Sequence, residues 1–161
     1  MLFRSKLGAD VPMCLVSRPL VARGIGEAIE LLPAFPSFSM VLGNPLVGVS
    51  TPEVFRLLSR KDNPPLLFSS RMPQGPDEWM ETIRSLRNDL EPPARAICGE
   101  ISTLAGLIGS QHAIVTRMSG SGATCFGIFD DIEQAEAAAV LLHSQRPDWY
   151  FQATETIAGE A

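Results

Sequence analysis

The sequence has no cationic run and no long apolar run, and each absence excludes a class of protein. Its 161 residues carry a net charge of −5, and no run of Lys or Arg interrupts this balance. Nucleic acid is therefore not an expected partner, because phosphate backbones are bound through clustered cations. The apolar runs are far shorter than the ~20 residues that span a bilayer. We expect neither a nucleic-acid nor a membrane partner.

Cysteine is also scarce. Cys14, Cys98 and Cys125 are widely spaced and form no C-x-x-C pair, so the sequence suggests neither a zinc site nor a disulfide framework, and we predict no metal ligands. The first residues, MLFRSKLGADVP, lack the apolar core of a signal peptide. A reducing cytoplasm is the expected compartment.

What is present indicates a folded α+β domain of ordinary size. Apolar residues make up 45% of the chain and charged residues 19%, which predicts a sizeable core. Hydrophobic patterning predicts helices within 50–59, 77–90 and 94–108 and a fourth that starts after residue 130. It predicts strands at 11–16, 20–26, 38–45, 113–117, 123–129 and 148–154, with a proline-rich surface loop at 61–76.

The order of these elements predicts a ferredoxin-like fold. From residue 38 onward, removing two helices leaves β-α-β-β-α-β, an antiparallel sheet with helices on one face. Residues 36–161 would form this domain, and residues 1–35 would belong to something else. Two helix starts look like capping boxes, one from Ser50 to Glu53 and one from Asp130 to Glu133.

A glycine-rich stretch, MSGSGATCF at 118–126, is the main candidate for chemistry. It is not a Walker A loop, since no Lys follows and the next element is a strand rather than a helix. The pattern G-x-G-x-x-G fails as well, because position 125 is Cys. Two readings stay open: a plain turn between strands, or successive backbone N–H groups that form an anion-binding nest.

Four stretches in order resemble the GHMP kinase superfamily, which includes galactokinase, homoserine kinase and mevalonate kinase. They are LGADVPMCL (7–15), NPLVGVSTPEVF (44–55), NDLEPPA (88–94) and RMSGSGATCFGIF (117–129). The glycine stretch is similar to the third motif of that superfamily. The STPEVF and NDLE stretches resemble the branch that transfers phosphate from ATP to the 2-hydroxyl of 4-diphosphocytidyl-2-C-methyl-D-erythritol, on the non-mevalonate route to isoprenoid precursors.

This resemblance implies roles for individual residues. Asp10 matches the catalytic aspartate, Thr51 a threonine close to it, and Phe55 an aromatic ring that stacks on cytosine. The loop residues that match the support of the phosphate-binding segment are Ser119, Gly120, Ser121 and Gly122. The implied cofactor is ATP, with Mg, and the implied partner is a small molecule that contains cytidine diphosphate.

Other interpretations remain beside these. Asp10 can be a simple turn aspartate, Ser50 and Thr51 can be helix caps, and Phe55 can pack at the edge of the core. The chain could instead be a kinase of the homoserine or mevalonate type. It could also be a ferredoxin-like module that binds a ligand or oligomerises without catalysis.

One departure from the superfamily is large. Its ATP loop, P-x-x-x-G-L-G/S-S-S, occurs nowhere in the sequence. Residues 1–35 then resemble the tail end of the N-terminal domain, ahead of a C-terminal domain at 36–161. Apolar stretches such as VPMCLV would be left exposed there, and we expect either disorder of this remnant or a homodimer through it.

We predict negligible kinase activity for the chain alone, because the glycine-rich ATP loop is absent from it. Incubation of the purified chain with ATP and the diphosphocytidyl substrate checks this, and clear turnover would refute it.

Overall fold

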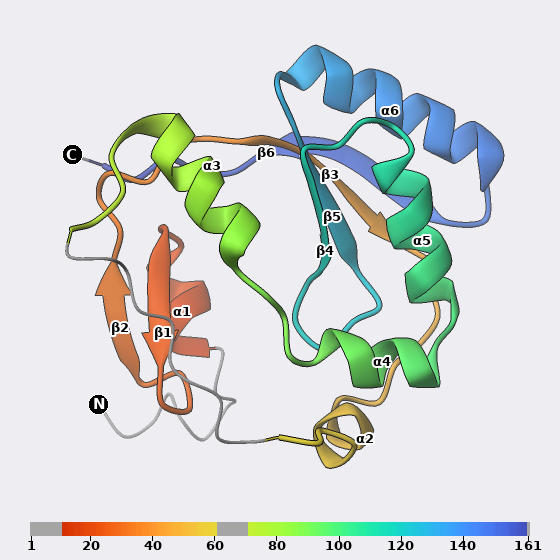
Figure 1. Ribbon diagram of the computed structural model, residues 1–161, viewed down its shortest axis with the longest axis horizontal. Helices are drawn as coiled ribbons and strands as arrows, with labels where there is room; N and C mark the ends of the chain where they lie inside the picture. Colours follow the sequence, from red (N-terminus) through yellow and green to blue (C-terminus); the bar gives the residue numbers. More distant parts are fainter. Residues whose placement is uncertain (1–10, 61–70, 161) are drawn as a thin grey trace.

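A computed structural model of the chain describes residues 11–60 and 71–160. Its larger sheet contains β3 (Ser39–Asn44), β4 (Val115–Met118), β5 (Cys125–Phe129) and β6 (Tyr150–Glu155). The strands lie in the order β4-β5-β3-β6, and every neighbouring pair is antiparallel. This is the strand order of the ferredoxin-like plan, so the α+β fold class predicted from the sequence is confirmed (Figure 1).

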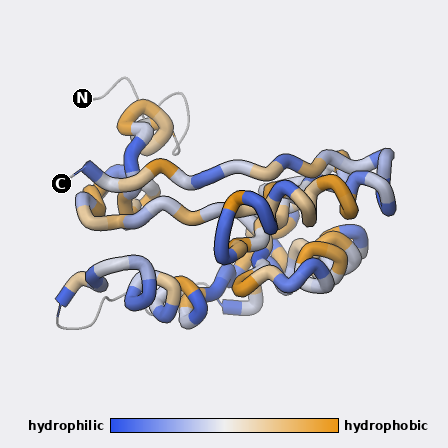
Figure 2. The backbone as a smooth tube through the Cα atoms, turned by 90° about the horizontal axis from the view of Figure 1, so that it is seen from above, coloured by the Kyte–Doolittle hydropathy of each residue, from blue (hydrophilic) through white to orange (hydrophobic). Residues whose placement is uncertain are grey.

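Two helices cover one face of this sheet. Helix α5 (Glu100–Gly109) contacts β3, β4 and β5, and helix α6 (Ile132–Gln145) contacts β3, β5 and β6. Seen from above, the helical layer runs along one side of the extended strands (Figure 2). The core between them is close to completely buried and includes Val41, Ile101, Leu104, Ile108, Cys125 and Leu142.

Strand β5 is buried on both faces. Its side chains alternate, as successive residues of a strand do: Cys125 and Phe129 enter the core under α5 and α6, whereas Ile128 enters a second cluster with Val115 and Trp79. Trp79 comes from α3 (Gly75–Ser85) and donates from its indole nitrogen to the Ala34 carbonyl at 3.1 Å. Helix α3 therefore covers part of the opposite face of the four-stranded sheet, for which the sequence predicted no helix.

The single helix predicted over 94–108 is two helices. Helix α4 (Glu91–Ile97) ends at Cys98, whose backbone is extended, and α5 begins after Gly99. The apolar stripe continues across the break because both helices face the same core, where Ala94, Ile101 and Ile108 are fully buried. Periodicity alone does not detect such a break.

The N-terminal prediction was wrong at VPMCLV. These residues form a helix, α1 (Val11–Val16), and the hairpin that follows pairs β1 (Leu20–Arg23) with β2 (Ala28–Leu31), a strand that was not predicted. A short apolar run without alternation fits a helix as well as a strand, and six residues are too few for the length of the run to distinguish the two. Figure 1 shows this two-stranded sheet apart from the four-stranded one.

Both capping boxes were also wrong in detail. Helix α2 (Thr51–Arg56) starts after Ser50, but the Ser50 side chain accepts no capping hydrogen bond. In α6 the cap is Asp131 rather than Asp130: its carboxylate accepts from the Gln134 backbone N–H at 2.7 Å, and the Gln134 side chain donates to it at 2.7 Å. The N-cap lies one residue later than the sequence placed it, and its second contact joins two side chains rather than forming the reciprocal bond of a capping box.

No helix within residues 11–60 and 71–160 is long and apolar enough to cross a membrane.

Two glycines offer a matched test of the core. A Cβ at Gly127 would lie 2.3 Å from Ile108 Cγ2 and 3.0 Å from Ala113 Cβ, whereas a Cβ at Gly106, on α5, would meet nothing within 4 Å. Gly127→Ala should therefore lower the free energy of unfolding by about 1–3 kcal/mol through overpacking. Gly106→Ala should raise it by about 0.5–1 kcal/mol, because alanine favours a helix.

Urea unfolding of both variants measures these changes. Equal stabilities of the two variants would contradict the packing of α5 against β5.

Candidate functional site

The candidate site is built around the loop between β4 and β5. Its neck is closed by a hydrogen bond from the Ser119 N–H to the Thr124 carbonyl at 2.8 Å, and its turn by one from the Gly122 N–H to the Ser119 carbonyl at 3.1 Å. Gly120 and Gly122 have φ of +56° and +94°, which L side chains rarely adopt. A Cβ at Gly122 would lie 3.0 Å from the Met118 sulfur. Both glycines are thus required by the backbone.

The first residue of helix α2, Thr51, contacts this loop. The Thr51 and Ser121 hydroxyls are 2.7 Å apart, a hydrogen bond between residues separated by 70 positions. Phe55 follows Thr51 by four residues, so it lies one turn along the same side of the helix. Its side chain is 50% exposed, whereas Val54 beside it is fully buried. Thr51, Phe55 and the loop therefore share one surface.

Two asparagines hold the loop from other directions. Asn44, at the end of β3, donates to the Thr124 hydroxyl at 2.8 Å and accepts from the Leu46 N–H at 2.7 Å. Asn88, just before α4, donates to the carbonyls of Met118 at 3.0 Å and Gly120 at 2.8 Å. Sequence reasoning assigned no role to either residue, and the only signal was their position in the quoted NP and NDLE stretches.

Helix α4 adds a charged pair beneath the loop. Glu91 accepts from the Met118 N–H at 3.4 Å and from Arg95 Nε at 2.9 Å. Arg117, next to the loop on β4, donates from its guanidinium to the Ile83 carbonyl at 3.0 Å and is thus tied to α3. The loop therefore meets its neighbours mostly through neutral polar groups.

The cysteine after the loop is a core residue. Cys125 is fully buried, and this burial raises the pKa of its thiol to about 12. A thiol with that pKa stays protonated at neutral pH and is no nucleophile. Both histidines, His112 and His143, are exposed, and in the described ranges no three His, Cys, Asp or Glu side chains gather to hold a metal ion.

Asp10, the predicted catalytic residue, lies outside the described residues. Of the other predicted site residues, the structure brings Thr51, Phe55 and the loop (Ser119, Gly120, Ser121 and Gly122) to one region.

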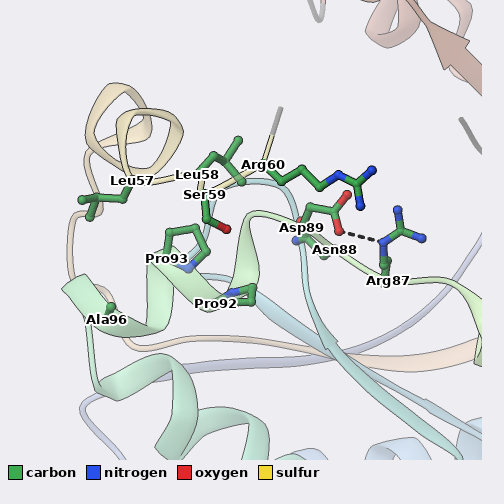
Figure 3. A pocket seen from close by; sticks show the side chains of 10 residues that line it. All are labelled: Leu57, Leu58, Ser59, Arg60, Arg87, Asn88, Asp89, Pro92, Pro93 and Ala96. Atoms are coloured by element: carbon green, nitrogen blue, oxygen red, sulfur yellow. Dashed lines mark hydrogen bonds and ion pairs between the residues drawn. The ribbon is translucent and has the colours of Figure 1, made fainter. Parts of the chain in front are cut away.

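A cleft of about 530 Å³ opens behind Asn88, between the C-terminal end of α2 and the start of α4. Figure 3 shows two arginines at its rim, Arg60 and Arg87, with Asp89 between them. Arg87 Nε pairs with the Asp89 carboxylate at 2.7 Å. The apolar wall is formed by Leu57, Leu58, Pro92, Pro93 and Ala96. Asn88 thus separates this cleft from the glycine loop.

With this geometry in place, comparison with known proteins identifies the family. Residues 74–145 match the family model described as the C-terminal part of GHMP kinases. The 4-diphosphocytidyl-2-C-methyl-D-erythritol kinase of Rhizobium etli is 60% identical over 154 residues, which are 96% of this chain and 51% of that protein. Residues 74–145 therefore carry the C-terminal domain of the GHMP kinases. It spans about half the length of the curated relatives that it matches, and the matched half is their C-terminal portion.

Solved structures agree with this GHMP kinase assignment. A crystal structure of 4-(cytidine 5'-diphospho)-2C-methyl-D-erythritol kinase matches with a TM-score of 0.72 and 30% identity, over 94% of this chain and 54% of that one. Homoserine kinase from Cytophaga hutchinsonii matches with a TM-score of 0.62 at 14% identity, over 94% and 52% of the two chains, which shows the fold alone. Sequence identity therefore favours the diphosphocytidyl branch over the homoserine branch.

The contact between Thr51 and Ser121 can be measured by a double-mutant cycle. Thr51→Val and Ser121→Ala each remove one hydroxyl, and we expect a coupling of about 0.5–1.5 kcal/mol in the free energy of unfolding, the usual net value of a hydrogen bond. Thr51→Val paired with Ser102→Ala, an exposed change on α5, should be additive. Additivity in both pairs would contradict the meeting of α2 with the loop.

Proposed function

We propose that the chain provides the substrate-binding part of an enzyme that phosphorylates the 2-hydroxyl of 4-diphosphocytidyl-2-C-methyl-D-erythritol with ATP, in the cytoplasm. The relatives that share this name support the proposal through their identity to the chain. The observation that carries it is the 2.7 Å hydrogen bond between Thr51 and Ser121. It joins the STPEVF stretch to the glycine loop, the two segments that the reaction needs side by side.

In this proposal Phe55 binds the base of the substrate. A ring that is half exposed at the surface of α2 offers a flat apolar face to a pyrimidine, and stacking gains contact area with little loss of side-chain entropy. Thr51 lies one helical turn away, and because its hydroxyl has one proton and two lone pairs it can hydrogen-bond the same ligand while keeping its contact with Ser121. The substrate would then extend from Phe55 toward the loop.

The loop contributes backbone groups near phosphate. Glycines at Gly120 and Gly122 allow the main chain to approach an anion closely, and exposed N–H groups there favour negative charge. Phosphoryl transfer depends mostly on such positioning and on electrostatic stabilisation. Asp10 would orient or accept the proton of the attacking hydroxyl.

ATP, with Mg, supplies the transferred phosphoryl group in this proposal. Among the described residues no three carboxylates, histidines or cysteines gather to hold a cation, so the metal is assigned to none of them.

We further propose that residues 1–35 and 36–161 are parts of two different domains of the kinase. The hairpin β1–β2 supports this, since it forms a sheet separate from the four-stranded one. It is tied to the chain end by the ion pair of Arg18 with Glu160 and by the Gly159 N–H, which donates to the Phe35 carbonyl at 2.7 Å. Exposed Leu15 and Ile25 on this part favour a contact with another domain or a second copy.

Calorimetry with cytidine 5'-diphosphate tests the substrate class. The chain should bind this nucleotide, and Phe55→Ala should weaken binding by about tenfold or more, because stacking of a base on an aromatic ring is worth ~1–3 kcal/mol. Leu57→Ala is the matched control, since Leu57 is similarly exposed on the same segment but lines the cleft instead. Its affinity should equal that of the wild type.

Homoserine and mevalonate should give no heat in the same experiment. Absence of nucleotide binding by the wild-type chain, or equal losses in the two variants, would contradict the proposal.

A further inference from the structure

The Asn88 side chain bridges two carbonyls of the glycine loop and the start of α4. Both protons of its carboxamide nitrogen are used, one toward the Met118 carbonyl at 3.0 Å and one toward the Gly120 carbonyl at 2.8 Å. Its Oδ1 accepts from the Leu90 N–H at 3.0 Å, which anchors the side chain to the start of α4. All the hydrogen-bonding groups of this amide thus connect α4 to the loop.

These contacts set the orientation of two peptide planes. In a trans peptide the C=O and the following N–H point in opposite directions. The Met118 carbonyl points to Asn88, and the Ser119 N–H accordingly points away and donates to the Thr124 carbonyl at 2.8 Å. The Gly120 carbonyl also points to Asn88, and the bond from Gly120 to Ser121 is trans. The Ser121 N–H must therefore point away from Asn88.

The Ser121 N–H differs from that of Ser119 in what it meets. It donates to no acceptor within the described part of the chain, whereas the Ser121 side chain is held by Thr51 at 2.7 Å. Asn88 thus holds the Gly120 carbonyl of this peptide, and Thr51 holds the Ser121 side chain. The Ser121 N–H remains as an unused donor. A donor held in place at a positive-φ loop suits an oxyanion.

We propose that Asn88 is a positioning residue, which holds the Gly120–Ser121 peptide plane so that the Ser121 N–H is presented to a phosphate oxygen of the ligand. The identity of that ligand as a cytidine diphosphate derivative rests on the proposed function. The orientation of the amide does not rest on it, because it follows from the hydrogen bonds that Asn88 and Thr51 make in the structure. Without the carboxamide the plane can rotate, and the donor is no longer fixed.

Two variants separate the donor role of Asn88 from its other contacts. Asn88→Asp keeps an acceptor for the Leu90 N–H but loses both donors and places a carboxylate against two carbonyls. Asn88→Ala loses the donors without adding charge. Asp89→Asn is the matched control, because Asp89 is the adjacent residue and pairs with Arg87 at the cleft, away from the loop.

Proton–nitrogen correlation spectra of the chain, titrated with inorganic pyrophosphate, provide the test. In the wild type and in Asp89→Asn, the Ser121 amide should shift on addition of pyrophosphate. In Asn88→Ala and Asn88→Asp, the Gly120 and Ser121 resonances without pyrophosphate should differ from those of the wild type. The apparent affinity for pyrophosphate, measured from the shift of the Ser121 amide, should fall at least tenfold. The remaining resonances should keep their dispersion, which shows that the fold persists.

Three results would overturn the proposal: no Ser121 shift in the wild type, equal shifts in Asn88→Ala and Asp89→Asn, or unchanged free-state Gly120 and Ser121 resonances in both Asn88 variants. If only one Asn88 variant folds, that variant decides. Failure of cytidine 5'-diphosphate to bind, with an intact Asn88-dependent pyrophosphate response, would reject the proposed substrate and retain the role of Asn88.

Discussion

The antiparallel pairing of β3 with β5 is the constraint on which the rest of the structure depends. In its register Gly43 pairs with Cys125, so the residue that leaves β3, Asn44, lies beside Thr124, which enters β5. In an antiparallel pair, one strand ends at the edge of the sheet where the other begins. The segment that leads to α2 and the glycine loop therefore emerge together, and Thr51 can reach Ser121. A change of register by one residue would invert every side chain of β5, which is buried on both faces.

The loop is organised by neutral hydrogen bonds rather than by charge. Asn44, Asn88 and Thr51 each hold a different part of it, and the nearby ion pair of Glu91 with Arg95 is largely self-satisfied. The Met118 and Gly120 carbonyls are occupied by the Asn88 amide and the Ser119 carbonyl by the Gly122 N–H, whereas the Ser121 N–H donates to no acceptor among the described residues. A free donor of this kind suits an anion, and the Cys125 thiol after the loop is buried and protonated and is therefore no nucleophile.

Much of the fold was predictable because its long elements have clear hydrophobic periods. The strands around the loop, α6 and the β-α-β-β-α-β order follow from alternation and helical spacing alone. The break between α4 and α5 did not show, since the apolar stripe crosses Cys98 and Gly99 unchanged. VPMCLV was assigned to a strand because six consecutive apolar residues fit the period of a helix and that of a strand equally well. The cap of α6 was placed one residue early because Asp130 and Asp131 are adjacent.

The site was less predictable, for a different physical reason. Because MSGSGATCF lies between two strands, the Walker A and dinucleotide-binding patterns could be excluded from the sequence. No local feature of the sequence indicates that Thr51 contacts Ser121, which lies 70 residues further along the chain. The resemblance to an ordered set of family motifs gave both residues a role at the site, but it did not predict their contact. Asn88 was passed over because an asparagine before an aspartate looks like an ordinary turn residue, and its role depends on the fold that brings α4 under the loop.

The central claim is that α2 and the glycine loop form one ligand surface, and mapping the binding of cytidine 5'-diphosphate by proton–nitrogen correlation spectra tests it most directly. The account predicts that the amides of residues 51–55 and 119–122 shift together with a single apparent affinity. Shifts confined to the hairpin at 20–31 or to the cleft at 57–60 and 87–89, or shifts of α2 and the loop with different affinities, would contradict it.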